Sequence, residues 1–74
     1  NWTFRAAAYE AMHLAEPNRA PWLENPAELQ QMIETMGRLP LFRETGWRIL
    51  RDTGALERAA RVDPRTWRKG LRCA

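Results

Sequence analysis

Four cations near the end of the sequence have the type and spacing of a surface that binds a polyanion. They occupy positions i, i+3, i+4 and i+7 of a helix that Asp63-Pro64 is predicted to start. On a helix, this spacing gathers all four within about 100° of arc, whereas Trp67 and Leu71 point roughly the opposite way. Such a face suits nucleic-acid phosphates, because each neutralised phosphate releases counterions and adds salt-dependent affinity. The four cations are Arg65, Arg68, Lys69 and Arg72.

Further cations flank this predicted face or surround a tryptophan elsewhere. Arg58 and Arg61 lie on the outer side of the preceding predicted helix and extend the basic patch. On an earlier helix, Trp47 falls outside the apolar stripe, with Arg43 and Arg51 one turn away on each side. A tryptophan between two arginines suits stacking on an unpaired base or filling a pocket on a protein partner. The alternative is that Trp47 turns inward, because so small a core needs every large side chain.

The residues for enzyme chemistry are incomplete. The chain contains no serine, and its one histidine, His13, has no nucleophile or second metal ligand near it in sequence. His13 is expected to be solvated, beside Tyr9 on the polar side of the first helix. Cys73, the single cysteine, is one residue from the end, where a buried orienting partner is rare. We therefore expect no enzyme activity, no cofactor and no metal site. The acids Glu10, Glu24, Glu28 and Glu34 all fall on polar positions, where helix solubility or capping explains them.

Length and composition predict one small domain over residues 1–74. A chain of 74 residues has room for one core, and 45% hydrophobic with 28% charged residues is typical of a folded globular protein. The net charge of +3 hides a separation, since residues 1–36 sum to −3 and residues 37–74 to +6. The start at Asn1 rather than methionine suggests a piece of a longer chain.

The sequence also limits where the protein is expected to act. Its apolar runs are far shorter than the roughly 18 residues that a membrane span needs, and no signal peptide is visible. A single cysteine cannot form an internal disulfide. We therefore expect no membrane partner, and a cytoplasmic or other reducing compartment.

The elements that would position these residues are all predicted to be helices, because no alternating β pattern occurs. A first helix is predicted from an N-cap at Thr3 to about residue 15 or 16, before Pro17. The residues expected on its inner face are Phe4, Ala7, Ala8, Ala11, Leu14 and Ala15.

A proline-rich loop and a strongly marked second helix follow. Residues 17–26 form the loop, which Trp22 and Leu23 are expected to pin to the core. Asn25 as N-cap and Pro26 at the first helical position start the second helix, which Gly37 is expected to close. Its predicted inner face comprises Leu29, Met32, Ile33 and Met36.

Three further helices complete the predicted fold. They cover residues 40–53, 55–62 and about 64–71, and Gly46 weakens the first of them by about 1 kcal/mol relative to alanine and could divide it into two turns. Tight turns marked by proline or glycine join them, so we expect an all-α, compact bundle of four to five short helices.

Two functions are compatible with this interpretation. The first is a non-enzymatic module that binds nucleic acid through the basic C-terminal helix. The second is a protein–protein interaction module, or a small structural subunit of a larger assembly, that uses arginine and tryptophan anchors. The pattern indicates no small-molecule substrate.

Overall fold

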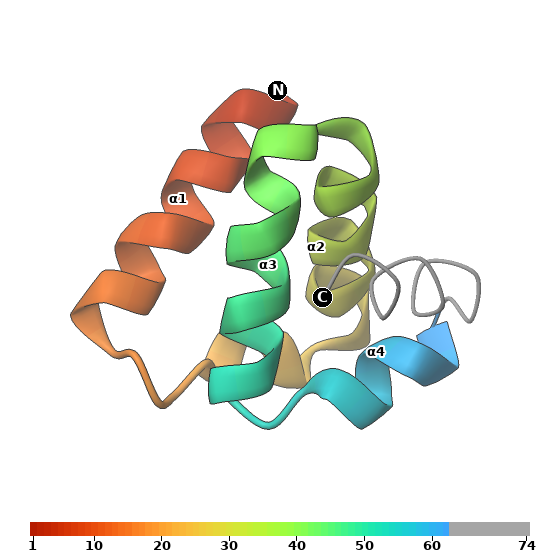
Figure 1. The fold of residues 1–74 in the computed structure, drawn as a ribbon. Coiled ribbons are helices and arrows are strands. Elements are labelled where there is room, and N and C mark those ends of the chain that lie inside the picture. Colours follow the sequence, from red (N-terminus) through yellow and green to blue (C-terminus); the bar gives the residue numbers. More distant parts are fainter. Residues whose placement is uncertain (63–74) are drawn as a thin grey trace.

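Four α-helices and one short 3-10 helix make up residues 1–62, the part of the chain that the computed structural model describes (Figure 1). No strand occurs among these residues, so the prediction of a small all-α bundle is confirmed. The fifth predicted helix, at about 64–71, lies outside the described residues. The elements are α1 (Trp2–Ala15), η1 (Pro21–Glu24), α2 (Pro26–Arg38), α3 (Pro40–Asp52) and α4 (Leu56–Val62).

Helix α2 is the centre of the bundle and packs against every other described element. It begins as its sequence predicts, with Asn25 Oδ1 accepting a hydrogen bond of 2.9 Å from the Ala27 amide. It ends at Arg38, beyond the predicted stop at Gly37, because Gly37 stays helical and the Leu39 amide closes the helix on the Thr35 carbonyl. The predicted inner face, Leu29, Met32, Ile33 and Met36, is buried.

Helix α3 lies against α2 as one continuous helix, as predicted for this stretch, and Gly46 does not divide it. Gly46 serves close packing instead. A Cβ atom at this position would lie 2.7 Å from the Met36 Sδ atom, which is inside any normal contact distance. The helix stops as predicted before Gly54, whose φ of 74° favours glycine.

The loop between α1 and α2 is pinned to the core, as predicted. Leu23 in η1 is fully buried, and the Trp22 ring stacks on Tyr9 of α1. Pro21 at the first position of η1 presets the backbone angle of this turn. The two anchors fix how the chain returns from α1 to α2.

Helix α1 differs from the sequence prediction in two respects, its N-cap and its buried face. Its N-cap is Asn1 rather than Thr3, since Asn1 Oδ1 accepts a 2.8 Å hydrogen bond from the Phe4 amide. Its inner side carries Ala6 and Tyr9, and the predicted inner face is mostly exposed. The reason is that alanines occur all round this helix, so the side holding the large ring of Tyr9 decides which face is buried.

Candidate interaction surfaces

The exposed side of α1 carries an apolar stripe, which we call the outer stripe and which consists of Phe4, Ala7, Ala11 and Leu14. Phe4 is 75% and Leu14 80% exposed, and both alanines between them are exposed. Their spacing of three, four and three residues keeps them within about 100° of arc. In Figure 1, α1 is at the left edge of the bundle, and no other described helix covers its left side. The outer stripe is therefore an apolar surface that residues 1–62 do not bury.

Contacts at the N-terminal end of α1 set the rotation that exposes the outer stripe. The Arg5 guanidinium donates to Gln31 Oε1 on α2 and lies 5.6 Å from the centre of the Trp2 ring. The Arg38 guanidinium of α2 lies 4.6 Å from the same ring. Cations this close to an indole ring are attracted to its face. Trp2 thus ties the first turn of α1 to the last turn of α2.

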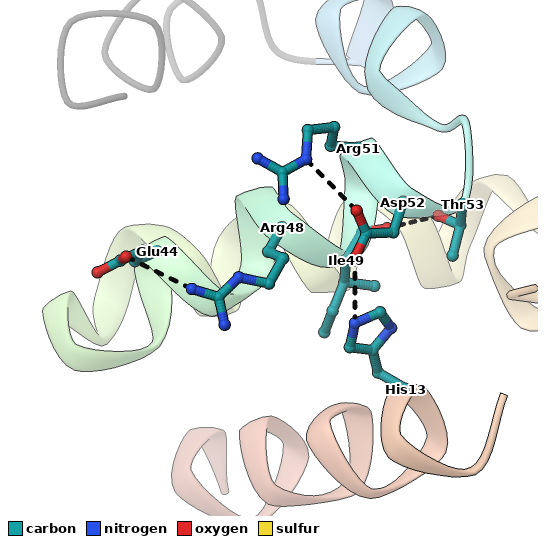
Figure 2. Close-up of polar contacts among 7 residues, drawn as sticks. All are labelled: His13, Glu44, Arg48, Ile49, Arg51, Asp52 and Thr53. Atoms are coloured by element: carbon teal, nitrogen blue, oxygen red, sulfur yellow. Dashed lines mark hydrogen bonds and ion pairs between the residues drawn. The ribbon is translucent and has the colours of Figure 1, made fainter. Parts of the chain in front are cut away.

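A second contact holds the C-terminal end of α1. Figure 2 shows His13 pointing from α1 to Asp52 near the end of α3, with Nε2 3.5 Å from the carboxylate. Arg51 Nε approaches the other oxygen of Asp52 at 3.3 Å. The His13 side chain is only 13% exposed, so the expectation of a solvated histidine is wrong. His13 is shielded from solvent because it lies on the same inward side of α1 as Tyr9.

Among residues 1–62, Tyr9 is the ionisable residue whose pKa its surroundings clearly shift. Burial raises the pKa of its phenol above the usual value of 10.0, and the nearby carboxylate of Glu28 acts in the same direction. Arg5 partly opposes both effects. Tyr9 is therefore a neutral, buried phenol at ordinary pH, suited to packing.

The predicted basic patch is described only in part. Arg58 and Arg61 are both exposed on α4, and Arg61 lies 3.8 Å from Glu57 one turn away. Because both members of this pair are well exposed, it reduces the positive charge locally but contributes little stability. Arg58 forms no ion pair within the described range. The other predicted cations, Arg65, Arg68, Lys69 and Arg72, lie outside it.

Trp47 of α3, which Arg43 and Arg51 flank, is turned toward the bundle and not fully presented to solvent for stacking. Trp47 is half-buried and packs against the hydrophobic core. Arg51 is exposed and bonded to Asp52, whereas Arg43 is half-buried and joins no ion pair among residues 1–62. The three side chains share one helix, but the packing of Trp47 indicates a structural role.

The described residues offer little support for other kinds of site. Residues 1–62 contain no group of three or more His, Cys, Asp or Glu side chains placed to hold a metal ion. None of the helices in this part of the chain is long and apolar enough to cross a bilayer.

Comparisons with protein-family models, curated proteins and solved structures find no match to the chain.

Proposed function

We propose that the chain is a small helical module that binds a protein partner through the outer stripe of α1. The observation that supports this is the exposure of two large apolar side chains, Phe4 and Leu14, in line with two exposed alanines. Single exposed apolar residues are ordinary on a protein surface, whereas an apolar row along one helix is a feature of interfaces.

The residue sizes in the outer stripe suit a helix as the partner element. Ala7 and Ala11 in the middle let another backbone come within about 8 Å of the α1 axis. Phe4 and Leu14 at the two ends then cover the sides of the incoming helix. Burying each of these two side chains is worth about 1.5–3 kcal/mol.

Helix α1 is also fixed in place before any partner arrives. The contact of Trp2 with Arg38 holds its start, and the pair of His13 with Asp52 holds its end. A surface that is already ordered loses less conformational entropy on binding, so more of the burial energy appears as affinity.

Site-specific photo-crosslinking tests this function. Benzoylphenylalanine at position 14 should trap protein when the full chain is illuminated in an extract of its own cells. The matched control is position 41, because Leu41 is 98% exposed but belongs to α3. Trapping at position 14 and not at position 41 supports the proposal. Equal trapping at both positions, or none at position 14, contradicts it.

Nucleic-acid binding is the second candidate function. The observation that favours it is the exposure of both Arg58 and Arg61 on α4, which directly precedes the remaining predicted cations in the sequence. Phosphate contacts of this kind predict an affinity for generic duplex or single strands that falls steeply between about 50 and 200 mM salt.

The salt dependence of binding by the full chain tests this second function. A double Arg68→Ala, Lys69→Ala change should flatten the dependence of log affinity on log salt by nearly two units, about one for each phosphate that is no longer neutralised. The matched control is Arg19→Ala, which removes one cation from the first half of the chain and should leave the slope unchanged. Absence of binding at low salt would rule the function out.

A further inference from the structure

We infer that the outer stripe of α1 pairs with the outer stripe of a second copy of this chain, with the two helices antiparallel about a two-fold axis. This inference rests on the proposed function, in which the outer stripe is a protein-binding surface. It adds the identity of the partner and the geometry of the complex.

The order of residues in the outer stripe is symmetric about position 9. Phe4 and Leu14 are each five positions from that centre, and Ala7 and Ala11 are each two positions from it. A two-fold axis at this point places Phe4 beside Leu14 of the second copy, and Ala7 beside its Ala11. Large residues then meet large ones at both ends, and small residues meet in the middle. A two-fold interface must be self-complementary in this way.

The spacing matches the seam of a two-stranded coiled coil. Intervals of three, four and three residues are those of alternating a and d positions over two heptads. Ala8, four residues after Phe4, borders the seam on one edge and leaves room for a closely packed helix. The antiparallel orientation is favoured over the parallel one because it sets the two helix dipoles in opposition.

One charged residue borders the seam and gives the dimer a specific signature. Glu10 is exposed on the opposite edge from Ala8, one position from the centre of symmetry. The two-fold axis keeps each edge against the same edge of the other copy, so the two Glu10 carboxylates approach within about a Debye length of 8 Å. Their repulsion opposes the apolar contact, and neutralising Glu10 should strengthen the dimer.

The size of the surface indicates weak and reversible pairing. Helix α1 has 14 residues and is about 21 Å long, and one face of it buries roughly 400 Å² per copy, about half of a standard interface. We therefore expect a dissociation constant between about 10 µM and 1 mM rather than a permanent dimer.

Sedimentation equilibrium of the full chain over this concentration range is the main test. Wild type should self-associate, Leu14→Lys should weaken association at least tenfold, and Glu10→Gln should strengthen it a few-fold. Leu41→Lys is the matched control, since it removes an even more exposed leucine outside α1, and it should leave association unchanged. A monomer throughout the range, or equal effects of the two leucine substitutions, overturns the inference.

Mapping a crosslink from benzoylphenylalanine at position 14 then fixes the orientation. Attachment to the segment of the second copy that contains Phe4 supports the antiparallel pair, and attachment around its position 14 overturns it. If the chain is monomeric while position 14 traps other proteins, this inference fails and the proposed function stands. If position 14 traps neither a second copy nor another protein, both fail.

Discussion

The rings of Tyr9 and Trp22 are stacked, with centroids 4.9 Å apart and planes 7° from parallel. This contact joins α1 to η1 and decides which side of α1 is buried. The Phe42 ring of α3 is tilted 32° from the plane of the Tyr9 ring, and the two ring centroids are 6.2 Å apart. Three elements therefore meet at Tyr9. Because the side of α1 that carries Tyr9 is buried, the side that carries the outer stripe is exposed.

Tyr9 should make the folded state sensitive to alkaline pH. Burial raises its pKa in the folded protein, so the unfolded chain releases the phenol proton first, near pH 10. The stability supplied by the neutral phenol is complete below pH 10 and declines as the pH rises through the higher folded pKa. The free energy of unfolding, measured in urea at pH 8 and pH 11, should fall more for wild type than for Tyr9→Phe.

The phenylalanine variant keeps the ring and removes only the ionisable group, so the difference between the two proteins reports the Tyr9 hydroxyl. Tyr9 is the only tyrosine in the chain, and its ultraviolet phenolate absorption therefore reports its titration directly. An identical loss of stability in both proteins would show that the burial of this hydroxyl has no energetic effect.

The sequence predicts the start and the inner face of α2 well because their signals are local. Asn25 and Pro26 start α2 through a side-chain cap and a preset backbone angle, and neither effect depends on the rest of the fold. The apolar residues of α2 lie on a single face, so its inner side is also unambiguous.

The inner side of α1 cannot be predicted in the same way. Its alanines occur on several sides, and the choice between Phe4 and Tyr9 depends on Trp22, which reaches Tyr9 only after the loop has folded back. In the sequence, the outer stripe is a set of apolar residues at helical spacing, and this pattern predicts a buried face. In the fold, the same face is exposed. Of the predicted cations, the exposure of Arg58 and Arg61 agrees with an outer surface.

Gly46 and Gly37 form a matched pair that separates packing from helix propensity. Both are helical, but a methyl group at position 46 would collide with Met36, whereas nothing lies within 4 Å of one at position 37. Gly46→Ala should lower the free energy of unfolding by about 1–3 kcal/mol through overpacking. Gly37→Ala should raise it by about 0.5–1 kcal/mol through propensity. Urea denaturation measures both, and stabilisation by both substitutions would mean that Met36 moves aside freely.

The pair of His13 with Asp52 should contribute to the docking of α1 on α3. A double-mutant cycle with His13→Ala and Asp52→Ala should give a coupling energy of about 0.5–1 kcal/mol, since both side chains are partly shielded. The exposed pair of Arg48 with Glu44, drawn in Figure 2, is the control and should give a coupling near zero. Equal couplings in the two cycles would argue against a special role for His13 in holding α1.

The first turn of α1 offers a test of the corrected N-cap. Asn1 Oδ1 accepts the Phe4 amide, so Asn1→Ala leaves that amide without its partner and should lower the free energy of unfolding by about 1 kcal/mol. Thr3 lies inside the helix with its side chain exposed, and Thr3→Ala should be neutral or slightly stabilising, because alanine has the higher helix propensity. Thermal unfolding of the two variants at one pH separates the assignments. A larger loss for Thr3→Ala than for Asn1→Ala would return the cap to Thr3 and shorten α1 by a residue or two at the end that carries Phe4.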